Sequence, residues 1–200
     1  SDWEFGYFAR YTKSPFDPNK PEPTGEMFKA NPDLRDWAYD LTKDLVLPDY
    51  ESLKETRNMY VNHPNAQKPP FVLKGGHIAA MTFWHGEILN DWANRWVSYW
   101  SNGDTDFVTS AMEDTGTFQA MVYLDNIGKV DKDRMMVLRA GSNYTMQPPG
   151  VTAAENLLKE NDGYAGMQAS LESLYIVGSK VLVELIDNWD VYEDSIPGGS

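Results

Sequence analysis

The sequence predicts an α/β fold, in which an open, mixed or parallel sheet is flanked by helices. Short apolar runs typical of buried strands, such as residues 107–109 and 135–138, alternate with longer segments whose apolar residues recur at helical spacing. Strands that are separated by helices pair in parallel, because the helix provides the crossover. At 200 residues, the chain is long enough for one core, so we predict that residues 1–200 form a single domain.

The first quarter of the chain is expected to combine an arm with two helices. Residues 1–31 are rich in aromatic residues, proline and glycine, which favours an extended arm or a short edge strand followed by a loop. A helix is predicted over residues 32–41, because Asn31 can cap its first turn and Pro32 fits the first helical position. A second helix is expected over residues 50–61.

The next segment should contribute two strands and a helix. Residues 71–73 and 78–83 are short apolar runs, and the glycine pair 75–76 between them predicts a turn. Residues 87–100 carry large apolar side chains at helical spacing, and the Asn-Gly pair at 102–103 is a typical helix stop. The segment therefore predicts a strand-helix succession.

The remainder of the chain continues the alternation. Strands are expected at residues 107–109 and 135–138, of which the second is apolar throughout, as in a strand covered on both faces. Helices are expected over residues 112–127, 153–160 and 167–189. The pattern is that of an open sheet, whose ligands bind beyond the carboxyl ends of the strands.

Composition excludes several classes of partner and chemistry. The 30 acidic and 17 basic residues give a formal net charge of -13, which repels nucleic acid and anionic lipid. The absence of cysteine excludes disulfides, thiolate zinc sites and a cysteine nucleophile. Since no apolar run approaches the roughly 20 residues of a membrane helix, we expect no membrane insertion.

Two polar segments follow predicted strands and could bind a ligand. At the first, Glu113 could accept hydrogen bonds from a vicinal diol if it is partly buried, or its acidic segment could simply complement a helix dipole. At the second, Asn143 offers a donor and an acceptor suited to a purine edge, next to the small residue Ser142. The alternative for Asn143 is an Asx turn in an ordinary loop.

A third segment, Phe83-Trp84-His85, could supply an aromatic face and a titratable group, although an isolated histidine is more often structural than catalytic. His63 and His77 lie in turn-like surroundings. No ligand spacing links the three histidines to carboxylates, so we predict no metal site.

Three ordered stretches of the sequence resemble the purine nucleoside permease family. They are residues 82–94 (TFWHGEILNDWAN), 107–116 (FVTSAMEDTG) and 137–150 (VLRAGSNYTMQPPG). The resemblance covers essentially the whole chain. Family members carry a preceding section with the first strands and a glycine-containing phosphate loop, which we do not find in this chain. The resemblance thus implies the C-terminal portion of a longer protein.

The family is in turn similar to purine nucleoside phosphorylases and methylthioadenosine nucleosidases. This implies a phosphorylase-like αβα fold in a truncated version. Met112 and Glu113 match the Met-Glu pair that lies under the ribose in those enzymes, while Ala111 replaces the further glutamate often found just upstream. Ser142 and Asn143 match the place that binds the purine and helps its departure. The resemblance therefore assigns candidate catalytic roles to Glu113 and Asn143.

The leading hypothesis is a purine nucleoside site related to N-glycosidic bond cleavage, as in a phosphorylase or nucleosidase. Phosphate as a co-substrate stays open, and no other cofactor is expected. Asn143 in place of an acid favours 6-oxo purines. Besides Met112, Ser142 and the two catalytic candidates, the segment Phe83-Trp84-His85 would line the pocket.

Two alternatives remain open: a non-catalytic protein that captures nucleosides for uptake, and an inactive truncated module. The partner is a purine nucleoside or base both in the leading hypothesis and in the capture alternative. The aromatic arm could cover a partner subunit in a homo-oligomer. By resemblance, we expect a periplasmic location, with a cytoplasmic one as the alternative.

Overall fold

The computed structural model describes residues 11–14, 17–20, 22–23, 25, 27–81, 83–160 and 163–199. About half of the predicted arm over residues 1–31 lies outside these ranges. Two compact units divide the chain. Unit 1 comprises residues 1–29 and 75–132, and unit 2 comprises residues 30–74 and 133–200. The prediction of a single domain remains a prediction.

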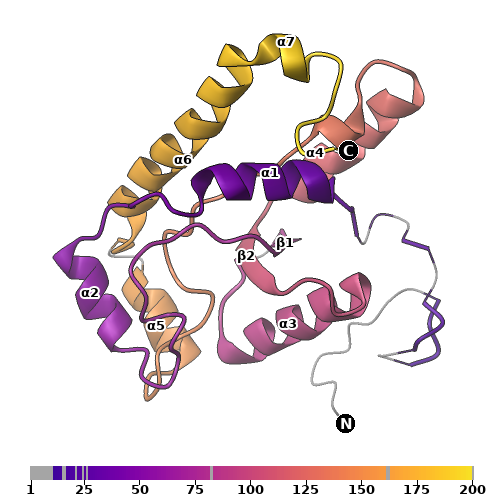
Figure 1. Cartoon of the computed structure of the whole chain (residues 1–200). Coiled ribbons are helices and arrows are strands. Elements are labelled where there is room, and N and C mark those ends of the chain that lie inside the picture. The colour runs from indigo at the N-terminus through magenta and orange to yellow at the C-terminus, as the bar shows by residue number, and fades with distance from the viewer. Residues whose placement is uncertain are drawn as a thin grey trace. The chain divides into compact units, whose positions relative to one another are not determined.

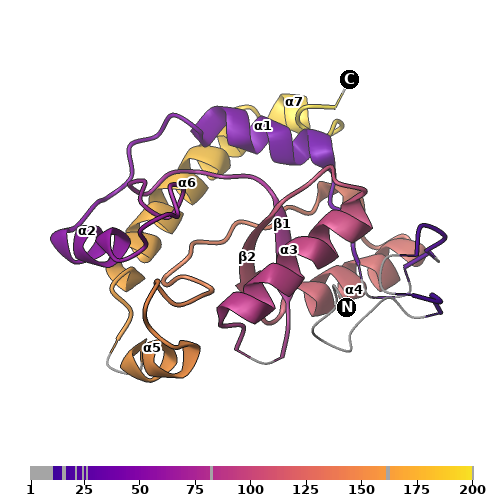
Figure 2. The ribbon, with the colours of Figure 1, turned by 90° about the horizontal axis from the view of Figure 1, so that it is seen from below.

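Unit 1 is built on a parallel β-α-β motif (Figure 1). Strand β1 (Gly76–Ala79) pairs in parallel with β2 (Phe107–Ala111), and helix α3 (Glu87–Ser101) connects them. Figure 2 shows α3 lying against the two strands. Helix α4 (Asp114–Asn126) follows β2. The expected α/β class and parallel pairing are confirmed, but the sheet among the described residues has two strands.

The glycine pair Gly75-Gly76 allows the two strands and α3 to approach closely. A Cβ atom on Gly75 would clash with Val108 Cγ1 and lie 2.8 Å from the Asp106 carbonyl oxygen. One on Gly76 would lie 2.5 Å from Val97 Cγ1. The predicted turn at this pair is wrong, because Gly76 begins β1 and its N–H donates to the Asp106 carbonyl. Glycine at these two positions therefore allows β2 and α3 to pack closely against the start of β1.

Aromatic side chains of α3 contact one another along the helix. The ring centroids of Trp92 and Trp96 are 5.0 Å apart, and those of Trp96 and the buried Trp100 are 5.7 Å apart. Helix α3 ends at Ser101 and is capped by Asn102, whose φ of 58° is left-handed, as the Asn-Gly pair predicts. Lys20, in the segment that precedes α1, donates to the Asn102 side chain at 2.7 Å. This hydrogen bond links residues 17–20 to the C-terminal end of α3.

Unit 2 is helical. It contains α1 (Pro32–Thr42), α2 (Glu51–Asn58), α5 (Ala153–Glu160), α6 (Met167–Asp187) and α7 (Trp189–Tyr192), and the 3-10 helix η1 (Lys132–Arg134) lies at the unit boundary. Helix α1 packs across α6 (Figure 1), with Leu34 and Ala38 buried on the first and Val177 and Val181 on the second. These four side chains are part of the core of the unit.

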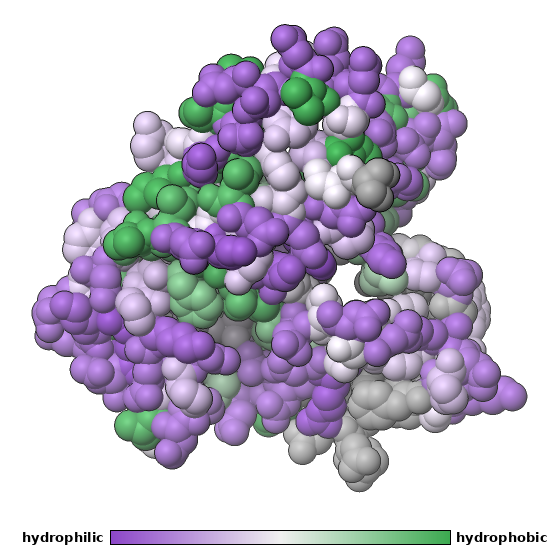
Figure 3. All heavy atoms as spheres, in the orientation of Figure 1, coloured by the Kyte–Doolittle hydropathy of each residue, from purple (hydrophilic) through white to green (hydrophobic). Residues whose placement is uncertain are grey.

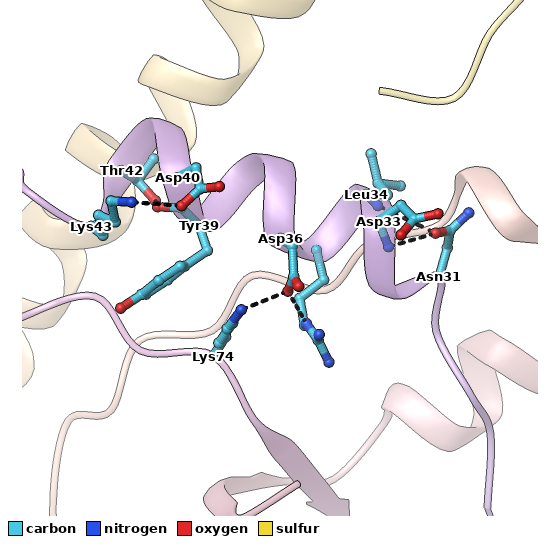
Figure 4. Close-up of polar contacts among 10 residues, drawn as sticks. Asn31, Asp33, Leu34, Asp36, Tyr39, Asp40, Thr42, Lys43 and Lys74 are labelled. Carbon is cyan, nitrogen blue, oxygen red and sulfur yellow. Dashed lines mark hydrogen bonds and ion pairs between the residues drawn. The ribbon is translucent and has the colours of Figure 1, made fainter. Parts of the chain in front are cut away.

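The start of α1 is capped as its sequence predicts. The Asn31 side chain accepts from the N–H groups of Asp33 and Leu34 at 2.9 and 3.3 Å (Figure 4). Pro32 occupies the first helical position. In the next turn, Asp36 lies 2.7 Å from Arg35 Nε and 2.9 Å from Lys74 Nζ. The two cations hold the pKa of Asp36 at about 2, with the Arg35 hydrogen bond as the larger cause.

Helix α6 leaves much of its apolar surface exposed. Figure 3 shows apolar side chains gathered where α6 lies in Figure 1. Its exposed large apolar residues include Leu171, Leu174, Tyr175, Leu182, Val183 and Ile186. An apolar surface of this extent is common at sites where proteins bind partners.

Two predicted strands are absent from the described residues. Residues 71–73 and 135–138 form no strand. The second run was expected to be covered on both faces, but Leu138 is 41 % exposed. A strand requires a neighbouring edge for its backbone, and an apolar run by itself does not provide one.

Candidate functional site

The predicted sugar-binding pair forms the turn between β2 and α4. Strand β2 ends at Ala111 and α4 begins at Asp114, so Met112 and Glu113 are the intervening residues. Met112 is 58 % exposed, and Glu113 is also exposed. One Glu113 carboxylate oxygen accepts from the Met112 N–H at 3.3 Å. The partial burial that the ligand-binding interpretation of Glu113 assumed is absent, because the residue lies in the turn beyond the end of the sheet.

The aromatic segment after β1 is divided between packing and exposure. The Trp84 ring lies 5.2 Å from that of Trp92, and its indole N–H donates to the Leu89 carbonyl at 3.2 Å. His85 is buried, with its ring 6.2 Å from that of Phe83. The Phe83 side chain is 48 % exposed. Trp84 therefore anchors the start of α3, and Phe83 is the ring of the segment most open to solvent.

These two segments emerge from the same edge of the sheet. Strands β1 and β2 are parallel, so residues 83–85 and 112–113 both follow carboxyl ends. The Ala80 N–H donates to the Ala111 carbonyl at 2.9 Å and extends the pairing beyond β1. Open parallel sheets bind ligands at this edge. The placement agrees with the sequence prediction for both segments.

Unit 2 holds the other predicted contacts, in a loop anchored by two tyrosines. The rings of Tyr60 and Tyr144 lie 4.1 Å apart. The hydroxyl of the buried Tyr60 donates to the Met146 carbonyl at 2.8 Å, and that of Tyr144 donates to the Ala66 carbonyl at 2.5 Å. Burial raises the pKa of Tyr144. The loop is thereby fixed to the segment after α2.

Within this loop, Ser142 and Asn143 make local contacts. Ser142 Oγ donates to Asn143 Oδ1 at 3.3 Å, and Asn143 Nδ2 donates to the Tyr144 carbonyl at 3.2 Å. A Cβ atom on Gly166, at the start of α6, would lie 2.5 Å from the Ser142 carbonyl oxygen. Asn143 is exposed, and the loop follows an irregular segment instead of the predicted strand.

One polar cluster in unit 1 was missed by the sequence analysis. His77 Nδ1 lies 2.7 Å from Thr109 Oγ1, and its Nε2 lies 2.6 Å from Asp114 Oδ2. The second contact has the distance of an ion pair, without the alignment of a good hydrogen bond. The His77 and Asp114 side chains are 18 % and 12 % exposed. The expectation of turn-like surroundings for His77 is wrong, since it lies in β1.

No group of three or more histidine, aspartate or glutamate side chains in the described ranges could hold a metal ion. No helix of the described chain is both long and apolar enough to cross a bilayer.

Comparison with known proteins identifies the family. The family model described as purine nucleoside permease matches residues 1–197. The chain belongs to the purine nucleoside permease family. It is 34 % identical over 170 residues to a purine nucleoside permease of Candida albicans, an alignment that covers 84 % of this chain and 41 % of the relative. The resemblance seen in the sequence is confirmed.

More distant similarity points to the same family. A probable purine nucleoside permease of Schizosaccharomyces pombe is 24 % identical over 166 residues, which cover 83 % of this chain and 47 % of the relative. The chain thus spans less than half the length of these curated relatives. No solved structure matches the chain.

Proposed function

We propose that this chain binds purine nucleosides as part of their uptake, without cleaving them. The observation that carries the proposal is the family match over residues 1–197, together with relatives named purine nucleoside permease. The proposed fold is a truncated phosphorylase-like αβα arrangement in a single domain. The parallel pair β1–β2, with α3 as its crossover, supports it.

We assign the sugar to the turn between β2 and α4. A carboxylate can accept hydrogen bonds from two neighbouring hydroxyls, and charged acceptors bind more strongly than neutral ones. Glu113 is exposed at the carboxyl edge of a parallel pair, where such a diol could reach it. The exposed Met112 side chain next to it would supply an apolar contact for the ribose.

Ser142 and Asn143 keep their predicted role as contacts to the purine base. The Asn143 amide can donate and accept, which suits the edge of a 6-oxo purine. Phe83, Trp84 and His85 are the proposed aromatic contacts, and Phe83 has the more exposed ring. None of these contacts requires a cofactor or a metal.

The nature of residue 143 favours capture over cleavage. Departure of a purine is helped by a group that gives it a proton, and a neutral amide such as Asn143 supplies a hydrogen bond alone. Glu113 could still stabilise positive charge on a ribosyl transition state. Cleavage by hydrolysis or phosphorolysis is therefore the competing function, and phosphate would be its co-substrate.

Location and assembly remain predictions. Capture of nucleosides for uptake fits a compartment outside the plasma membrane, such as a periplasm. A homo-oligomer is also expected, and the exposed apolar face of α6 is compatible with one.

The test measures binding and chemistry in one sample. Inosine is incubated with the chain, bound nucleoside is measured by equilibrium dialysis, and free base is measured by liquid chromatography with and without phosphate. Saturable binding with intact inosine recovered supports capture. Release of hypoxanthine would replace capture by cleavage, and phosphate dependence would identify the nucleophile. Absence of binding would refute both functions for this chain.

A further inference from the structure

One imidazole contacts both ends of the turn that carries Met112 and Glu113. His77 Nδ1 lies 2.7 Å from Thr109, which precedes the turn, and Nε2 lies 2.6 Å from Asp114, which follows it. The three side chains come from β1, β2 and the first residue of α4. We refer to Thr109, His77 and Asp114 as the turn clamp.

The fold brings the clamp together through the register of the sheet. His77 and Thr109 are partners in the parallel pairing, so their side chains extend from the same face. Asp114 begins α4 three residues after the end of β2, which returns its side chain toward that face. An acidic residue in a first helical turn normally complements the helix dipole in solvent. Here Asp114 is buried and lies against the imidazole.

The clamp matters because the turn itself is exposed. Met112 is 58 % exposed, and the Glu113 carboxylate extends from an α4 cap position that makes no side-chain capping bond. The direction in which these exposed side chains leave the turn depends on how its backbone is held, and the His77 contacts lie on both sides of it. The Thr109 hydroxyl can donate to Nδ1 or accept from it, so this contact can persist in either protonation state of His77.

We propose that the turn clamp positions Glu113 to receive the ribose hydroxyls, so that His77, Thr109 and Asp114 are positioning residues of the nucleoside site. This inference rests on the proposed function. A merely structural cluster would stabilise β1 and β2 without changing the direction of Met112 and Glu113. The two roles therefore differ in what happens at the turn when one contact is removed.

The experiment removes one hydroxyl and follows the turn and the ligand separately. Thr109→Val deletes the contact to His77 and keeps a strand-favouring side chain, whereas Thr109→Ser retains the hydroxyl. The chain is labelled with 13C in the methionine methyl groups, and the Met112 signal reports the turn. Inosine affinity is measured by calorimetry. Thr56→Val is the matched control, because it also deletes a threonine hydroxyl, one that donates to the Ser52 carbonyl within α2 and lies outside the clamp.

The clamp predicts that Thr109→Val displaces the Met112 signal and weakens inosine binding about fivefold, the loss that corresponds to about 1 kcal/mol. Thr109→Ser and Thr56→Val should resemble the wild type in both measurements. His77→Leu, whose side chain has no polar atom and therefore loses both contacts, should reproduce the effect of Thr109→Val and provides an independent variant.

The clamp is refuted if Thr109→Val leaves the Met112 signal in place, or moves it without changing inosine affinity. A wild-type chain that binds no inosine would refute the proposed function and with it the role of the clamp in binding. In that case the Met112 signal still decides whether the cluster sets the direction of the turn. Failure of the two claims is therefore distinguishable.

Discussion

The close approach of β1 to β2 makes Gly75 intolerant of a side chain. An alanine Cβ at this position would clash with Val108 Cγ1 and lie 2.8 Å from the backbone oxygen of Asp106. Neither neighbour can shift without a cost in energy. The valine side chain is restricted about χ1, and the Asp106 carbonyl belongs to the backbone directly before β2. Gly116, in the first turn of α4, has no atom within 4 Å of the corresponding Cβ position. The same substitution should therefore have opposite effects at the two sites.

The expected magnitudes follow from overpacking and from helix propensity. Overpacking of this kind costs about 1–3 kcal/mol, so Gly75→Ala should destabilise the chain by that amount. Gly116→Ala should stabilise it by up to about 1 kcal/mol, because alanine is the better helix former. For a chain of this size, each kcal/mol changes Tm by about 2–4 °C. Thermal unfolding followed by circular dichroism resolves both changes.

A second substitution tests the cause. Val108→Ala removes the clashing methyl groups, so Gly75→Ala should cost less in that background than in the wild type, which a double-mutant cycle measures. Equal Tm values for Gly75→Ala and the wild type, or a stabilising effect of the same sign as Gly116→Ala, would refute the described packing of β1 on β2.

Three further predictions concern unit 2. Asn31→Ala should destabilise the chain by about 1 kcal/mol through loss of the α1 cap, and Asn31→Ser should recover most of it in urea unfolding. Tyr144→Phe should cost about 1 kcal/mol because its carbonyl partner loses the hydroxyl donor, and an unchanged urea midpoint would contradict the anchored loop. The pKa of Asp36 is lowered from 3.8 to about 2 by Arg35 and Lys74, so its ion pairs stabilise the fold fully above pH 3.8 and progressively less as pH falls through 2. The stability difference between wild type and Asp36→Asn should accordingly be constant near neutral pH and shrink below pH 4, whereas a pH-independent difference would show that these pairs contribute nothing.

The helices were predictable because their signals are local. Asn31 and Pro32 specify the start of α1, and Asn102 and Gly103 specify the end of α3. Strands depend on partners that are distant in sequence. The apolar run 135–138 has the composition of a strand and still forms none, whereas β1 includes the glycine that was expected to make a turn.

The same distinction between local and distant signals applies to the candidate site. The boundary between β2 and α4 follows from an apolar run that changes to acidic residues, and this locates Met112 and Glu113. The exposure of Glu113 could not be read from the sequence, because it depends on what packs near the turn. The cluster of His77, Thr109 and Asp114 depends on the register of two strands 32 residues apart, which no local pattern encodes.

The central claim is that the chain binds purine nucleosides through Glu113. Calorimetric titration of inosine into the wild type, Glu113→Gln and Glu87→Gln tests it, since Glu87 is an exposed glutamate in the first turn of α3 and serves as the matched control. Saturable binding by the wild type and Glu87→Gln, weakened by about tenfold or more in Glu113→Gln, is the predicted result, because a hydrogen bond to a charged group contributes about 1.5–3 kcal/mol. Flat titrations for the wild type, or equal affinity in Glu113→Gln, would contradict it.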